Sequence, residues 1–143
     1  MSIARIISNR NITIVTCDPR QSVADAITSL SEQRIGAMPV MDQEGTVIGV
    51  FSERDVIRCL RERGGDALAE RVEAVMTAPA VTVTPDTTED KALALMTQRR
   101  IRHLPVMDGG RMVDFVSIGD LVKSRIDAVE AEAAAMRSYI RNA

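Results

Sequence analysis

Apolar and polar positions change their period along the first sixty residues, and each change marks an element. β-Branched residues from Ile12 to Thr16 predict a strand, which Asp18-Pro19 ends. Ser22 is expected as the N-cap of a helix, because apolar residues follow at helical spacing through Leu30. The order so far is a strand and then a helix.

The next stretch returns to short apolar runs separated by turn residues. We predict strands over Ala37–Met41 and Thr46–Phe51, joined by a turn at Asp42–Gly45. A second helix starts around Asp55 and ends at Gly64-Gly65. The unit is therefore β-α-β-β-α.

The whole pattern occurs twice. Matched segments recur in order about 66 positions later, and they pair Val15–Pro19 with Val81–Pro85, Pro39–Asp42 with Pro105–Asp108 and, after a one-residue deletion, Ser52–Asp55 with Ser117–Asp120. The second copy predicts a strand over Val81–Thr84, a helix over Thr88–Arg99, strands over Leu104–Met107 and Met112–Ser117, a turn at Asp108–Gly110 and a helix from Asp120. The chain is a tandem duplication.

A single unit of ~55 residues buries too little apolar surface to be stable alone. We therefore expect an α/β (α+β) fold in which the two repeats pack as a pseudo-twofold pair with facing sheets. Repeat 1 with the N-terminal segment spans 1–64, and a linker over 65–80 contains a short helical piece at Val72–Met76. Repeat 2 spans 81–126, and a C-terminal amphipathic helix spans 127–143.

The C-terminal helix carries an apolar stripe along one side. Its members alternate spacings of three and four and are Ile126, Val129, Ala133, Met136 and Ile140. The stripe either packs on its own chain or meets its counterpart in a second subunit.

The composition argues against several classes of protein. Hydrophobic residues make up 45% and charged residues 27%, and 18 basic against 20 acidic residues give a net charge of −2, without the basic excess of nucleic-acid binders. Cys17, Cys59 and the single histidine show no spacing typical of a disulfide framework or a metal site. No signal peptide or membrane span is apparent, so we expect a cytoplasmic protein with no membrane partner.

At this point the duplicated motifs support a family. Thr-x-x-x-Pro, then Pro-Val-Met-Asp, then Ser-x-x-Asp at a strand-to-helix junction, all in duplicate, resemble the CBS (cystathionine β-synthase) domain. The pair resembles a Bateman module. This resemblance implies a regulatory module that binds an adenosine-containing ligand, such as AMP, ADP, ATP or NAD(H), in clefts between the repeats.

The resemblance also implies the residues of two unequal clefts. The preferred ligand site combines Thr16, Cys17, Ala37, Met38, Arg102, His103, Ser117 and Asp120. The second site combines Thr82, Ser52, Arg54 and Asp55.

The chemistry of these residues fits such a ligand. A carboxylate such as Asp120 can accept both hydrogen bonds of a ribose diol, and Asp55 occupies the same place in repeat 1; both could instead be ordinary helix caps. Arg102-His103 can receive a phosphate, which favours the Asp120 cleft. Gly36-Ala37 stand at the same place in repeat 1 and leave a slot for a flat ring.

Further positions qualify this interpretation. Adenine would be recognised by main-chain groups near Cys17 and Ala37, although core packing explains the apolar residues there equally well. Asp114 stands where repeat 1 has Gly49, so an acidic group could repel a phosphate in the preferred cleft. Arg54 could add a phosphate contact in the other cleft.

Catalysis is not indicated. One histidine and acidic residues spread along helices provide no nucleophile with a base and no metal-carboxylate cluster. The leading hypothesis is a nucleotide-sensing module, expected as a homodimer, that modulates its own packing or an unknown partner protein. The alternative is a ligand-independent interaction scaffold.

Overall fold

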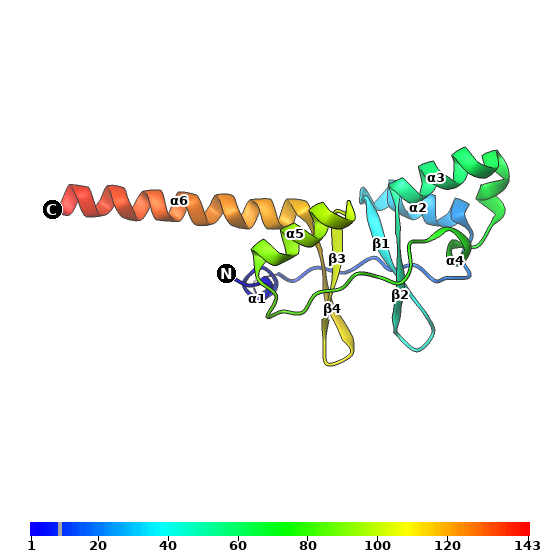
Figure 1. The fold of residues 1–143 in the computed structure, drawn as a ribbon, viewed down its shortest axis with the longest axis horizontal. Coiled ribbons are helices and arrows are strands. Elements are labelled where there is room, and N and C mark those ends of the chain that lie inside the picture. Colours follow the sequence, from blue (N-terminus) through cyan, green and yellow to red (C-terminus); the bar gives the residue numbers. More distant parts are fainter. Residues whose placement is uncertain (9) are drawn as a thin grey trace.

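The computed structural model describes residues 1–8 and 10–143, and it has two similar halves and one long helix. Figure 1 shows two β-hairpins side by side, with helices at one end of each and the last helix extending far from the body. The segment between the two hairpins includes the 3₁₀ helix η1 (Gly64–Ala69) and the four-residue helix α4 (Val72–Val75).

Each half contains one antiparallel hairpin. Strand β1 (Ala37–Met41) pairs with β2 (Val47–Ser52), and β3 (His103–Asp108) pairs with β4 (Arg111–Ser117). The turn between β3 and β4 uses Gly109 and Gly110 at φ values of 59° and 79°, a conformation of tight hairpins that glycine adopts without strain. The hairpins predicted from the apolar runs are confirmed.

The predicted helices are also confirmed, and so is the N-cap predicted at Ser22. Ser22 caps α2 (Val23–Gln33) by accepting from the Asp25 N–H, and α3 (Glu53–Arg63) ends at Gly64. Thr88 caps α5 (Glu89–Arg99) in the same way as Ser22 caps α2.

The strand predicted over 12–16 is wrong, because this segment forms only a single bridge, at Cys17 just beyond that range. The Cys17 N–H donates to the Pro39 carbonyl at 3.0 Å, and its carbonyl accepts from Met41 at 2.9 Å. Continuing this parallel pair in either direction needs an N–H from Pro39 or from Pro19, and proline has none. Two prolines therefore limit the strand to one residue.

The second repeat shows the same limitation. The strand predicted over 81–84 reduces to a bridge between Val83 and Val106. Pro85 and Pro105 occupy the corresponding places, so the next donor is missing on each side. Each hairpin thus gains one residue of a third strand rather than a full strand.

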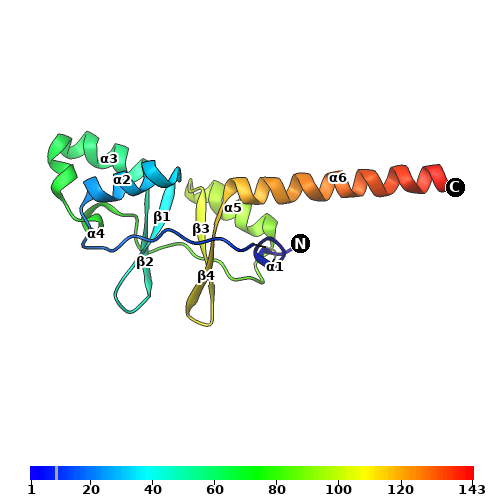
Figure 2. The same ribbon diagram turned by 180° about the vertical axis from the view of Figure 1, so that it is seen from behind.

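Helix α1 (Ile3–Ser8), which the pattern analysis did not predict, packs on the second half of the molecule. Ile3 is fully buried in the core that includes Leu104 and Leu121, and its N–H donates to the Thr87 carbonyl at 2.9 Å. From there the chain runs past both hairpins to reach α2 (Figures 1 and 2). The first residues therefore complete the second repeat.

Helix α4 does the same for the first half and confirms the helical piece expected in the linker. Val72 and Val75 are buried in a separate core with Met38 and Phe51, and the Val72 N–H donates to the Gln21 carbonyl at 2.9 Å. Since Gln21 corresponds to Thr87 at the repeat offset, α1 and α4 are equivalent elements. Helix α1 precedes repeat 1 and completes the core of repeat 2, whereas α4 precedes repeat 2 and completes the core of repeat 1.

The C-terminal part is one continuous helix, α6 (Ile118–Asn142), of 25 residues. Ser117 is its N-cap and Leu121 is its one buried residue. Its second half extends beyond both halves of the body (Figure 2).

The packing of α1 makes a testable prediction. Truncating Ile3 to alanine removes a fully buried side chain from the second core and should lower the free energy of unfolding by ~2–5 kcal/mol. Ile12→Ala removes the same atoms from a side chain that is 53% exposed and should change it little. Urea denaturation of both variants measures the difference, and equal effects would contradict this placement of α1.

Candidate ligand cleft

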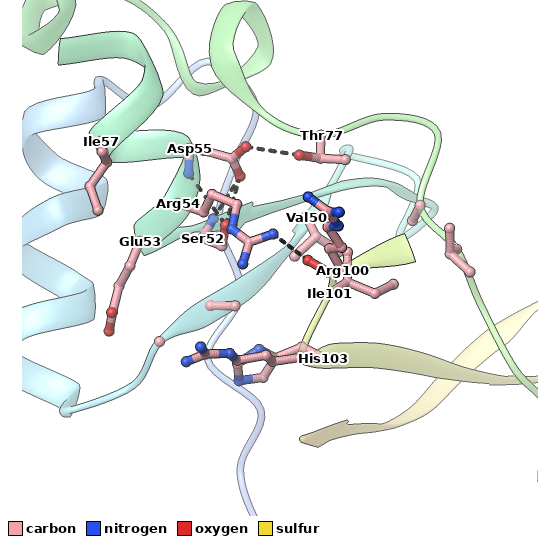
Figure 3. Close-up of a pocket in the computed structure, with 15 residues that line it drawn as sticks. Val50, Ser52, Glu53, Arg54, Asp55, Ile57, Thr77, Arg100, Ile101 and His103 are labelled. Atoms are coloured by element: carbon pink, nitrogen blue, oxygen red, sulfur yellow. Dashed lines mark hydrogen bonds between the residues drawn. The ribbon is translucent and has the colours of Figure 1, made fainter. Parts of the chain in front are cut away.

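A cavity of about 390 Å³ lies between the two repeats, and residues of both repeats line it. Repeat 1 contributes the junction of β2 and α3, the linker contributes Thr77, Ala80 and Val81, and repeat 2 contributes residues 100–103 (Figure 3). The volume is within the range of small-molecule sites.

Asp55 lines this cleft, and both oxygens of its carboxylate accept hydrogen bonds. Oδ2 accepts from the Ser52 N–H at 2.9 Å, and Oδ1 accepts from Thr77 Oγ1 and Arg58 Nη2, each at 2.8 Å. The residue is only 1% exposed. Ser52 is the N-cap and Asp55 completes a capping box, so Asp55 is not itself the cap, and its carboxylate fixes the linker against α3.

Cationic and apolar groups line the front of the cleft. Arg54 reaches from α3 across the cleft and donates to the carbonyl of Arg100, as Figure 3 shows. Arg102 is a third arginine on this lining, and Ile57, which is 69% exposed, and Ile101 provide apolar surface. The cleft can therefore receive an anion and a flat apolar group together.

His103 and Glu53 lie beside the slot expected at Gly36, which lines the cavity. A Cβ added to Gly36 would lie 3.5 Å from His103 Cε1, and the imidazole also stacks on Phe115 with ring centroids 5.4 Å apart. Burial lowers the pKa of His103, and Arg102 lowers it further, against the opposing charges of two carboxylates. At neutral pH the ring is uncharged, so the arginines supply the positive charge.

In the other predicted site, the carboxylate of Asp120 is bound by a side chain of the protein itself. Arg10 forms ion pairs with Asp120 Oδ2 at 2.8 Å and with Asp114 Oδ1 at 2.7 Å. Ser117 and Asp120 form the same capping box as in repeat 1. Burial alone would raise the pKa of Asp120, but the Ser117 N–H and Arg10 outweigh it and hold the pKa below its ordinary value.

Gly49 and Asp114, which occupy corresponding positions, explain the difference between the clefts. A Cβ at Gly49 would lie 2.8 Å from the Thr77 carbonyl, so only glycine lets the linker backbone pair with Val50. Asp114 has a side chain at this position and is 4% exposed, so it needs a cation. Arg10 supplies it and takes the place of the backbone pairing.

The remaining sequence-predicted residues lie elsewhere. Thr16 and Thr82 are exposed and do not line the described cavity, whereas Met38 is fully buried in the first core. Cys17 is 2% exposed, and burial, followed by the charge of Asp18, raises the pKa of its thiol to about 11. The cavity thus combines Ser52, Arg54 and Asp55 of the second predicted site with Ala37, Arg102 and His103 of the first.

Sequence reasoning missed Arg10 and Thr77, which belong to the segments after α1 and α4. A signal existed, because Ile3, Ile6 and Ile7 match residues 72, 75 and 76 at a constant offset. That offset differs from the one relating the two hairpins, so the main repeat does not reveal it.

The Arg10 ion pairs make a pH-dependent prediction. Arg10→Met leaves Asp114 buried without its cation and should cost about 3 kcal/mol of stability at neutral pH. Because the folded pKa of Asp120 is below the unfolded value of 3.8, its part of this stability is complete above that pH and is lost as pH falls through the folded pKa.

Denaturation of both proteins from pH 7 to pH 2.5 measures this. The exposed Arg20–Asp18 pair, at 3.6 Å, provides the control, and Arg20→Met should have almost no effect. A gap between wild type and Arg10→Met that does not shrink in acid would contradict the assignment to these carboxylates.

Known proteins resemble this chain over most of its length. The profile described as CBS domain matches residues 5–62 and 72–127. The structure of a CBS-domain-containing protein from Agrobacterium tumefaciens aligns with a TM-score of 0.83 at 34% identity, covering 87% of this chain and 92% of that one. A protein with CBS domains from Burkholderia ambifaria has a TM-score of 0.80 and 42% identity, over 89% and 95% of the two chains.

Two curated relatives show how far the likeness extends. CBSX3, a mitochondrial CBS domain-containing protein of Arabidopsis thaliana, is 33% identical over 129 residues, which are 87% of this chain and 63% of that protein. Inosine-5′-monophosphate dehydrogenase of Mycobacterium tuberculosis is 32% identical over 112 residues, but these are only 20% of the enzyme. The match therefore leaves out most of the enzyme.

Two structures solved with ligands share the fold. CBSX2 in complex with AMP has a TM-score of 0.74 at 24% identity, over 89% of this chain and 97% of that one. A CBS domain pair in complex with 5′-methylthioadenosine and S-adenosyl-L-methionine has a TM-score of 0.74 at 22% identity, over 86% and 98%.

Within the described ranges, the structure has no helix able to cross a membrane and no group of three metal-ligating side chains. Since the profile matches twice and spans most of the chain, the protein belongs to the CBS domain family and carries two CBS domains in tandem.

Proposed function

We propose that this protein is a regulatory module that binds an adenosine-containing ligand in the cleft beside Asp55. The observation that carries the proposal is the cleft itself, which is open, is formed by both repeats and combines apolar surface with three arginines. Arg10 occupies the carboxylate of Asp120, so the proposal favours the cleft that the sequence placed second.

The lining matches the parts of a nucleotide. Ile57 and Ile101 offer apolar surface to a base, and Ile57 is exposed enough for a base to reach its side chain. Arg100 and Arg102 are placed to receive phosphate by charge-assisted hydrogen bonds. Asp55 acts as a positioning residue, because it holds Ser52 and Thr77, whose side chains line the cleft.

The ligand class draws support from relatives of the same fold. One was solved with AMP, and another with 5′-methylthioadenosine and S-adenosyl-L-methionine. These ligands share the adenosine group and differ in charge beyond it. An arginine-rich lining favours the phosphorylated members of the class, so we place AMP, ADP, ATP and NAD(H) ahead of uncharged nucleosides.

Regulation follows from the position of the cleft between the repeats. A ligand that contacts both repeats stabilises one relative packing over another and so shifts the population of conformations. Such a shift would act on a partner chain or on the packing of a dimer. The competing function is a ligand-independent scaffold, which the exposed apolar surface of α6 favours.

A thermal-shift panel distinguishes the two functions. A ligand present at a hundredfold excess over its Kd and bound only by the folded protein adds about 2.7 kcal/mol of stability, which raises the Tm by several degrees. We expect this shift with AMP, ADP, ATP or NAD(H) and none with GTP. If no adenosine compound changes the Tm, the scaffold function is favoured.

Arg102 gives a sharper test of the phosphate contact. Arg102→Ala should reduce the affinity for AMP about tenfold or more and leave that for adenosine nearly unchanged, because one charge-assisted hydrogen bond contributes about 1.5–3 kcal/mol. Arg99→Ala removes an equal charge three residues away, from a position that does not line the cavity. Calorimetric titration of both variants measures the affinities, and equal losses would show that only overall charge matters.

A further inference from the structure

An uncovered apolar stripe runs along α6 from the body to the C-terminus. Val129 is 57% exposed, Met136 is 56% exposed and Ile140 is 69% exposed, although buried positions are usual for such residues. Figures 1 and 2 agree that the second half of α6 lies beyond the rest of the chain. A helical segment of about a dozen residues that packs on nothing is only marginally stable in water, so the second half of α6 needs a partner.

The stripe is distinct from the face of α6 that packs on the body. Leu121 is buried in the second core, and Ser124 donates to Glu89 Oε1 at 2.7 Å. At 100° per residue, these two positions lie on a different side of the helix from Val122 and Ile126, which are 46% and 51% exposed. Packing within the chain therefore leaves the large apolar residues of the stripe exposed.

The stripe has the spacing of a coiled coil. Positions a of the heptad hold Ile126, Ala133 and Ile140, and positions d hold Val122, Val129 and Met136. The spacing of four and three residues continues from the body to the end of the helix, over ~30 Å. A narrow a/d stripe of this kind fits one other helix with the same pattern.

We propose that α6 pairs with α6 of a second copy of this chain in a parallel, in-register coiled coil. The flanking e and g positions carry the argument, since their charges alternate in blocks. Lys123 and Arg125 are basic, Glu130 and Glu132 are acidic, and Arg137 is basic.

In a parallel pair, a g residue meets the e residue of the next heptad on the other helix. Arg125 then meets Glu130 of the second copy, and Glu132 meets Arg137 of the second copy, so both kinds of contact are attractive. Arg125 also pairs with Asp90 of its own α5, which holds it beside the stripe.

The antiparallel alternative brings like charges together. In that arrangement e residues meet e residues and g residues meet g residues. Alignment of the a and d positions then places Glu130 and Glu132 against their own counterparts and Lys123 against Arg137. The charge pattern therefore selects the parallel orientation, which places both bodies at the same end of the assembly.

The molar mass of the full chain tests the pairing. Sedimentation equilibrium should give twice the 15.6 kDa of one chain. Met136→Asp places a charge in the stripe, beyond the body, and should halve the mass without changing the melting of the body. Ala135→Asp places the same charge on the neighbouring face and should leave the dimer intact. A monomeric wild type, or a dimer unaffected by Met136→Asp, would overturn the proposal.

Cysteine cross-linking tests the orientation. Ile140→Cys lies beside its own counterpart in the parallel pair and should form a disulfide-linked dimer under mild oxidation, whereas the antiparallel pair separates the two thiols by ~27 Å. Ser138→Cys lies on the outer face and should not cross-link. Failure of Ile140→Cys to cross-link in a dimeric protein would overturn the parallel orientation. The inference goes beyond nucleotide binding, and any AMP-induced rise in Tm should persist in Met136→Asp.

Discussion

Gly49 and Asp114 occupy the same place in the two hairpins, and the contact that each makes determines the cleft beside it. At Gly49 there is room for the linker backbone, which pairs with Val50 and carries Thr77 to the carboxylate of Asp55. At Asp114 a side chain occupies that space, and the N-terminal segment is held through Arg10 instead. One repeat thus uses a backbone pairing where the other uses an ion pair.

This difference gives the two clefts unequal chemistry despite equal folds. Both capping boxes are preserved, so both aspartates have a structural role at the start of a helix. The Asp55 carboxylate has no free oxygen, and the cleft in front of it is left to arginines and apolar side chains. The Asp120 carboxylate is bound to Arg10. Under the proposed function, this asymmetry would leave one cleft per chain for the ligand, and the proposed pairing of α6 would bring two such clefts into one assembly.

Much of the fold could be predicted from local pattern, whereas the site depended on contacts that local pattern does not contain. The hairpins, the helices and their caps follow from periodicity and turn residues, because those signals act over a few positions. The strands predicted over 12–16 and 81–84 were wrong although Pro19 and Pro39 are evident in the sequence. The N–H groups that these prolines lack matter only once the pairing partner of each strand is known. Arg10 and Asp114 form an ion pair although they are 104 positions apart in the sequence, and no short motif can predict such a contact. The resemblance predicted the class of site, whereas packing placed Arg10 on Asp120 and left a cavity beside Asp55.

Methyl NMR of isoleucine-labelled protein titrated with AMP tests the central claim most directly, because isoleucines lie in the open cleft and also away from it. Ile57 and Ile101 line the open cleft, Ile12 is two residues from Arg10 in the sequence, and Ile3 reports on the second core. Saturable shifts at Ile57 and Ile101, with Ile12 and Ile3 unchanged, are the predicted result. Shifts centred on Ile12, or none at Ile57 and Ile101 while AMP binds, would contradict the account.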